Sequence, residues 1–102
     1  MAGLFDWDPA KAASNRLKHG VRFETAALVF VDPLALTEFD GFDHSEPRWR
    51  TIGMAGGVQL LVVAHTQRDG NGDEVIRIIS ARRAAPRERR RYGEGPGGPF
   101  RA

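Results

Sequence analysis

After Pro33, four apolar segments follow one another, separated by turns that contain glycine. They are rich in β-branched and aromatic residues, which is typical of strands, and they cover residues 34–39, 48–55, 58–66 and 75–82. Gly56-Gly57 is a two-residue hairpin signal, and the polar residues 68–73 form a longer turn before the last segment. Strands joined in this way pair side by side in opposite directions. The second half of the chain therefore predicts an antiparallel sheet.

The first third of the chain has helical spacing. A short strand over residues 4–7 precedes Asp8-Pro9, where Asp8 can cap a helix and Pro9 suits its first turn. A basic last turn and a glycine at His19-Gly20 end this helix. A second, shorter helix spans residues 23–30 and stops before Pro33, because the residue that precedes proline avoids the helical region. Two helices are thus expected before the sheet.

The carboxyl-terminal segment predicts a short last helix over residues 86–92, followed by a flexible tail rich in glycine and proline over residues 93–102. A chain of 102 residues supports one domain, here residues 1–92. Two helices, then four strands, then a short helix indicate an α+β fold in which the N-terminal helices pack on a mostly antiparallel sheet.

Composition excludes several classes of protein. The chain has no cysteine, which excludes disulfides and thiolate metal sites and fits a cytoplasmic protein. No apolar run approaches the roughly 18 residues of a membrane span, and the first residues do not have the pattern of a signal peptide. Motifs of nucleotide-binding loops, serine elbows and zinc proteases are absent. The acidic segment Asp40 to Glu46 is interpreted as solvated, so neither a metal nor a cofactor is expected.

Charge is distributed unevenly along the chain. The net formal charge is only +2, yet residues 23–47 hold six acidic residues and no Lys or Arg. Residues 77–91 hold seven arginines and one glutamate. Guanidinium groups bind phosphate or carboxylate through two hydrogen bonds, so this basic segment fits a nucleic acid or an acidic protein partner. As a third interpretation, residues 77–91 form a face that is basic only for solubility. The acidic stretch over residues 23–47 either contacts a partner or is merely solvated.

Three histidines and one tyrosine are candidates for proton transfer near neutral pH. His65 falls on the apolar face of its strand, so a core histidine is the alternative, and His19 is also explained as a helix cap. Metal-free cleavage of RNA needs a base, an acid and fixed cations around the phosphate. Arg77 and Arg82 could supply the cations, but five residues apart they face opposite sides of a regular strand. A bulge, or an earlier end of the strand, is needed to bring them together.

Several short motifs resemble, in their order and spacing, those of the BrnT toxins. They are Phe5-Asp6-Trp7-Asp8-Pro9-Ala10-Lys11, Asn15, Lys18-His19-Gly20-Val21, Phe23, Phe30-Val31-Asp32-Pro33, Asp43-His44-Ser45-Glu46, Arg50, Ile52-Gly53, Leu61-Val62-Val63-Ala64-His65-Thr66, Arg77-Ile78-Ile79-Ser80-Ala81-Arg82 and Glu88-Arg89-Arg90-Arg91-Tyr92. The resemblance extends over nearly the whole predicted domain. The chain departs from the family pattern in the tail after Tyr92 and in the turn at residues 69–73.

The resemblance implies a RelE-like ribonuclease toxin of a bacterial type II toxin-antitoxin pair, which inhibits translation by cutting RNA without a metal ion. The partner that it implies is a BrnA-type antitoxin with a ribbon-helix-helix region. Operator DNA would be bound only through the complex of the two proteins.

The same resemblance implies the residues of the site. We expect Arg77 and Arg82 to stabilise the phosphate and His65 or Tyr92 to move a proton. The residues expected to hold the RNA backbone are Lys18, His19, His44 and Arg90.

Two other functions compete with this interpretation. A non-catalytic interaction module would use the arginines to bind an acidic partner protein. A DNA-binding regulator is less favoured, because no helix-turn-helix is evident and the net charge is small.

Overall fold

The computed structural model describes residues 4–70 and 73–94. Its elements are β1 (Leu4–Asp6), α1 (Pro9–His19), α2 (Phe23–Ala26), the 3-10 helix η1 (Ala27–Val31), β2 (Leu36–Asp43), β3 (Glu46–Ala55), β4 (Gln59–Gly70), β5 (Asp73–Arg83) and α3 (Pro86–Glu94). The predicted α+β fold is confirmed. No helix within the described ranges is long and apolar enough to cross a membrane.

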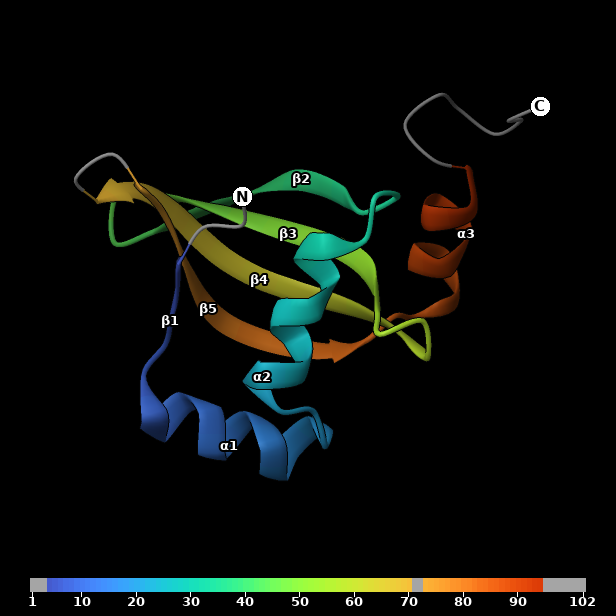
Figure 1. Ribbon diagram of the computed structural model, residues 1–102, viewed down its shortest axis with the longest axis horizontal. Helices are drawn as coiled ribbons and strands as arrows, with labels where there is room; N and C mark the ends of the chain where they lie inside the picture. The colour runs from blue at the N-terminus through green and yellow to red at the C-terminus, as the bar shows by residue number, and fades with distance from the viewer. Residues whose placement is uncertain (1–3, 71–72, 95–102) are drawn as a thin grey trace.

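The five strands form one sheet in the order β1-β5-β4-β3-β2. Strands β2 to β5 make the expected antiparallel meander, and β1 adds to it in parallel beside β5, with Phe5 opposite Ile76. Helices α1 and α2 cover one face of the sheet, whereas α3 stands at its side, near the turn between β3 and β4 (Figure 1). We call the opposite face, which α1 and α2 do not cover, the open face.

The predicted helix over residues 23–30 is divided into α2 and η1. Its buried side chains Phe23, Ala26 and Val29 recur every three residues, and the tighter 3-10 winding keeps such a repeat on one side. The backbone of η1 approaches β3 closely at Gly53, where a Cβ atom would lie only 3.0 Å from the Cβ of Val29. Glycine at position 53 therefore allows η1 to pack on the sheet.

Strands β2 to β5 are longer than predicted, whereas β1 ends one residue earlier, at Asp6. Strands β2 and β3 meet at a tight turn in which His44 and Ser45 have positive φ angles. The hairpin turn predicted at Gly56-Gly57 is present but has three residues, because Ala55 pairs with Gln59 and Val58 belongs to the turn. The expected polar turn over residues 68–73 is largely strand, with residues 71 and 72 outside the described ranges. Helix α3 continues to Glu94, so it includes the first residues of the predicted tail; the rest of that tail also lies outside the described residues.

Two apolar clusters hold the layers together. The larger one fills the space between the helices and the sheet; its buried members are Val21, Phe23, Ala26, Val29, Ala55, Leu61, Val63, Ile76, Ile78 and Ala81. The smaller one lies on the open face beside α3, with Ile52, Leu60, Val62 and Ala84 buried and Met54 and Tyr92 packed against them. The open face is therefore apolar at the α3 end, and its charged residues lie elsewhere.

Asn15 joins α1 to the sheet through three hydrogen bonds. Its Nδ2 donates to the carbonyl oxygens of Ala81, at 2.9 Å, and Val21, at 3.1 Å, and its Oδ1 accepts from the Ala81 amide at 3.1 Å. Strand β1 pairs with β5 only opposite residues 75–77 and does not reach Ala81. The side chain of Asn15 thus takes the place of a neighbouring strand there.

Replacing Asn15 with Ala should lower the free energy of unfolding by about 2 to 4 kcal/mol, because buried backbone groups lose their partners. Ser14→Ala, at an exposed position on the same helix, is the matched control and should change it by less than about 0.5 kcal/mol. Urea unfolding of both variants measures the difference. Equal stability of the two variants would contradict the role given to Asn15.

Candidate functional site

A bulge in β5 decides which face its arginines occupy. Strand β4 pairs His65 with Ile78 but Ala64 with Ser80, which leaves Ile79 as an extra residue. Ile78 before the bulge and Ala81 after it both point into the larger core cluster. Alternation along the strand then places Arg77 and Arg82 together on the open face. The structure thus supplies the bulge that the sequence required.

Arg77 and Arg82 share a face but not a position. Their partners on β4 are Thr66 and Val62, four residues apart, which corresponds to about 13 Å along the strand. Arg77 Nη1 donates to Asp6 Oδ2 at 2.6 Å, at the β1 side of the sheet. The two guanidinium groups therefore lie in different ionic surroundings.

Arg82 belongs to a network of charged side chains on the open face, which we call the arginine network. It contains four arginines and three carboxylates: Arg48, Arg50, Arg82, Arg91, Glu38, Asp40 and Glu88. Arg48 pairs with Asp40 at 3.2 Å, Arg50 pairs with Glu38 at 3.1 Å, and Arg91 of α3 also binds Glu38. Strands β2, β3 and β5 and helix α3 thus contribute to one charged surface with a net charge of +1.

The pair Arg82–Glu88 is the most tightly bonded part of this network. Both guanidinium nitrogens Nη1 and Nη2 donate to the carboxylate of Glu88, each at 2.7 Å, and Glu88 Oε1 also accepts from the amide of Ala85 at 2.8 Å. The hydrogen bonds from Arg82 lower the pKa of Glu88 to about 2, and those to Glu88 raise the pKa of Arg82. Glu88 therefore remains charged, fixes the guanidinium and caps the first turn of α3.

Three polar atoms of the same face are buried with no hydrogen-bond partner among the described residues: Arg48 Nε, Arg50 Nε and Thr66 Oγ1. Two of them belong to guanidinium groups of the arginine network. Because these atoms are buried, a ligand on the surface would meet the terminal nitrogens of the guanidinium groups and not these atoms.

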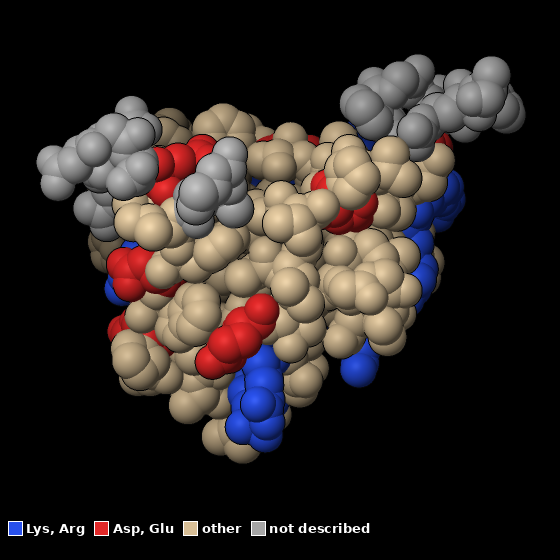
Figure 2. All heavy atoms as spheres, viewed as in Figure 1, with Lys and Arg blue, Asp and Glu red and all other residues tan. Residues whose placement is uncertain are grey.

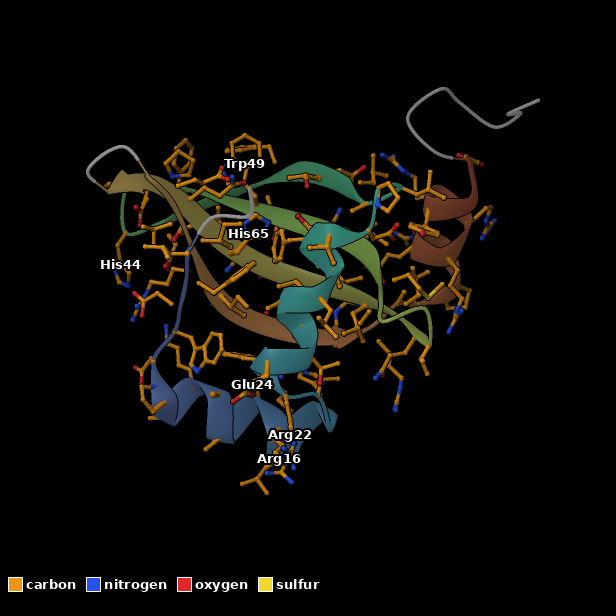
Figure 3. The ribbon with its side chains drawn as sticks, in the orientation of Figure 1. Arg16, Arg22, Glu24, His44, Trp49 and His65 are labelled. Carbon is orange, nitrogen blue, oxygen red and sulfur yellow. The ribbon has the colours of Figure 1, made fainter. Side chains whose placement is uncertain are left out.

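His65 lies on the other face of the sheet, in the core. Its side chain is fully buried, its Nε2 is 2.8 Å from Thr51 Oγ1, and its ring meets the edge of Phe30 at a centroid distance of 4.8 Å. In Figure 3, His65 lies beside the α2–η1 segment. Burial lowers the pKa of His65 to about 4, so the ring is neutral at pH 7. His65 therefore lies on the opposite face of the sheet from Arg77 and Arg82. Its position is that of a core histidine, the alternative given from the sequence.

Tyr92 connects α3 to the loop after η1. Its hydroxyl donates to Asp32 Oδ2 at 2.7 Å, and the amides of Met54 and Leu34 donate to the same carboxylate. Burial raises the pKa of Asp32, but these three hydrogen bonds together outweigh it, so that the pKa is lowered. The ring of Tyr92 packs on the apolar end of the open face. Tyr92 therefore borders the face that carries the arginine network.

The residues expected to hold RNA do not gather at one place. Lys18 and His19 end α1, on the helix-covered side of the sheet, and His44 is at the β2–β3 turn with its side chain 95% exposed (Figure 3). Arg90 is exposed on α3, where it borders a shallow pocket with Arg87, Arg91 and Glu94. Of these four residues, only Arg90 lies on an element that carries the arginine network.

Sequence reasoning missed most of the arginine network. Arg48 and Arg50 alternate along β3, and Glu38 stands opposite Arg50 in the β2–β3 register. Charged residues at alternate positions of two neighbouring strands are the signal that indicates a common face. Arg91 and Glu88 carried no comparable signal, because the position of α3 against the sheet is a tertiary feature. No group of three or more His, Asp or Glu residues within the described ranges is arranged to hold a metal ion.

The class of protein follows from comparison with known families and structures. Residues 7–88 match the family described as "Ribonuclease toxin, BrnT, of type II toxin-antitoxin system". The crystal structure of the Brucella abortus ribonuclease toxin BrnT, at 1.1 Å resolution, is similar, with 25% sequence identity and a TM-score of 0.62. The match covers 80% of this chain and 97% of that one, and no curated protein sequence matches.

These findings identify a ribonuclease toxin of a type II toxin-antitoxin system, a class of protein that acts on RNA and has a cognate antitoxin. The chain belongs to the BrnT family.

The buried His65 should make the protein less stable in mild acid. Because the unfolded chain binds the proton near pH 6.5 and the folded one only near pH 4, stability is fully present above pH 6.5 and is lost as the pH falls toward 4. Between pH 7 and pH 5 we expect a loss of about 2 kcal/mol in the free energy of unfolding.

His65→Gln, which can still bond to Thr51 but does not titrate, is the matched control for this prediction. The free energies of unfolding of this variant, measured with urea at pH 7 and pH 5, should differ by much less than those of the wild type. If the free energy of unfolding depends equally on pH in the two proteins, titratable groups other than His65 cause the acid sensitivity.

Proposed function

We propose that this toxin is a metal-independent endoribonuclease whose reacting phosphate is bound on the open face of the sheet by the arginine network. The observation that carries the proposal is the concentration of four guanidinium groups on this face. When the 2′-hydroxyl of RNA attacks the neighbouring phosphorus, negative charge increases on the phosphate oxygens. Fixed guanidinium groups stabilise that charge without a metal ion.

Arg82 is the proposed centre of this site. It approaches the middle of the network from β5, and the carboxylate of Glu88 holds its guanidinium in a fixed orientation. A phosphate would meet donors that are already oriented, and preorganisation of this kind is the main source of electrostatic stabilisation in enzymes. Arg77, about 13 Å away along the strand, is suited to bind a neighbouring phosphate of the same RNA chain.

Tyr92 is the proposed proton-transfer residue. Of the two candidates, His65 is fully buried on the other face, whereas the ring of Tyr92 borders the open face. Arg90, exposed on the same helix, would bind RNA outside the reacting centre. Contacts of Lys18 and His19 with RNA would need a chain that passes round to the helix-covered side of the domain, and a contact with His44 would need one that reaches the β2–β3 turn.

The family supports a further part of the proposal, which concerns partners. The cognate antitoxin is proposed to be of the BrnA type, with a ribbon-helix-helix region that binds operator DNA, and the toxin would reach that DNA only within the complex.

The second candidate function is a non-catalytic module whose arginines bind an acidic partner protein. One observation favours it: the guanidinium groups of the arginine network are each bonded to a carboxylate of the chain itself, so they also serve to hold α3 on the sheet. Expression of the toxin gene without its antitoxin separates the two functions. Growth arrest supports the nuclease, and normal growth with a well-expressed protein supports the module.

Arg82→Ala should lower kcat/KM for RNA cleavage in EDTA at least about 100-fold, because it removes a donor that acts on the charge of the transition state. Cleavage of a labelled RNA by the purified toxin measures this effect. Arg22→Ala, at an exposed arginine beside α2, should leave the rate unchanged.

Glu88→Gln is the control for a purely structural effect of Arg82. It breaks the same ion pair and should cost a similar amount of stability, about 1 to 2 kcal/mol. The Gln carbonyl oxygen can still accept a hydrogen bond from Arg82 and keep its guanidinium oriented, so the loss of cleavage activity should be much smaller than for Arg82→Ala. If Arg82→Ala and Glu88→Gln lose activity equally, Arg82 acts through the fold and not on the phosphate.

Tyr92→Phe should reduce kcat strongly with little change in KM, because it keeps the packing of the ring but removes the proton. The lost hydrogen bond to Asp32 should cost about 1 kcal/mol of stability. An unchanged kcat in a variant with that loss of stability would limit Tyr92 to anchoring α3.

A further inference from the structure

Apolar side chains line a groove between η1, the β3–β4 turn and α3. One part of the groove, about 360 Å³ in volume, is bordered by Leu28, Val31, Met54 and Tyr92, with Asp32 at its side. A second part, of about 430 Å³, continues from Met54 past Val58. Met54 lines both parts, so they lie next to each other, and we refer to them together as the groove.

The groove exposes more apolar surface than the fold requires. Leu28 is 44% exposed, Val31 66% and Val58 84%, and Leu34, which follows Pro33 of the groove wall, is 47% exposed. In Figure 2 the corresponding surface between the α2–η1 segment and α3 is mostly uncharged. A contiguous group of large exposed apolar side chains is unusual for a monomer and marks an interaction site.

The two ends of the groove differ in charge. Arg83 and Arg89 border the second part, and no carboxylate in the described ranges forms an ion pair with either. At the other end, the carboxylate of Asp32 accepts hydrogen bonds from Tyr92, Met54 and Leu34. A ligand that fits would bring apolar side chains to the Val31 end and negative charge to the arginine end.

We propose that this groove binds an amphipathic acidic segment of the cognate antitoxin. Its apolar side chains would cover Leu28, Val31 and Val58, and its carboxylates would pair with Arg83 and Arg89. The proposal rests on the proposed function only in taking the antitoxin as the partner. Tyr92 lines the groove, whereas the arginines of the network do not, so an antitoxin segment bound here would contact the proposed proton-transfer residue without contacting those arginines.

The test uses purified toxin and the purified antitoxin encoded beside it, with affinity measured by isothermal titration calorimetry. Val31→Glu and Val58→Glu place a negative charge at exposed positions of the groove, so the fold should be kept. Each should weaken antitoxin binding at least tenfold. Leu17→Glu changes an equally apolar side chain that is 90% exposed on α1, away from the groove, and should bind as the wild type does.

Arg89→Glu tests the charge at the other end. It should weaken binding and reduce the dependence of the affinity on salt concentration, because an ion pair with the antitoxin is lost. RNA cleavage in EDTA, measured on the same preparations, should be unchanged by Val31→Glu and Val58→Glu.

Wild-type affinity in both valine variants would overturn the proposal. It would also be overturned if these variants lost RNA cleavage but not antitoxin binding, which would assign the groove to RNA, or if wild-type toxin alone formed a dimer that Val31→Glu dissociates. Weakened antitoxin binding in a toxin that cuts no RNA would support the groove and reject only the nuclease.

Discussion

The extra residue at Ile79 is the constraint on which the arrangement of the open face depends. Without it, a strand that buries Ile76 and Ile78 would place Arg82 toward the core, where an unpaired guanidinium is very costly. With it, β5 keeps Ile78 and Ala81 in the core and Arg77 and Arg82 on the open face. One local irregularity therefore reconciles the packing of the core with a cationic surface.

The charges on that surface are organised by their carboxylate partners. Glu38 and Asp40 come from the edge strand and Glu88 from α3, so the guanidinium groups are fixed by three separate elements. Such pairs contribute little to stability where solvent reaches them, but they hold arginines in place despite mutual repulsion. The network therefore attaches α3 to the sheet, and in the proposed function it also keeps donors oriented for the phosphate of RNA.

The site was only partly predictable from the sequence, for identifiable reasons. Arg77 and Arg82 were candidates from the sequence, and the need for a bulge or an earlier strand end to bring them to one face was recognised, because alternation along a strand is a local rule. His65 was ambiguous because a histidine on an apolar strand face suits both a core and a site; its burial against Thr51 and Phe30 depends on helices that lie elsewhere in the chain. The parts of the network contributed by Glu38, Asp40 and Arg91 required the register of β2 and the placement of α3.

The sequence by itself determined the order of helices and strands, the antiparallel meander and the family, because hydrophobic period, turn residues and motif spacing are properties of neighbouring residues. It also determined that the positive charge would be concentrated near the carboxyl end. Only the tertiary structure decided that β1 lies beside β5, that Asn15 completes the edge of β5 and that α3 meets the open face. These contacts join residues as many as 71 positions apart, and their energies depend on burial and geometry that no local pattern encodes.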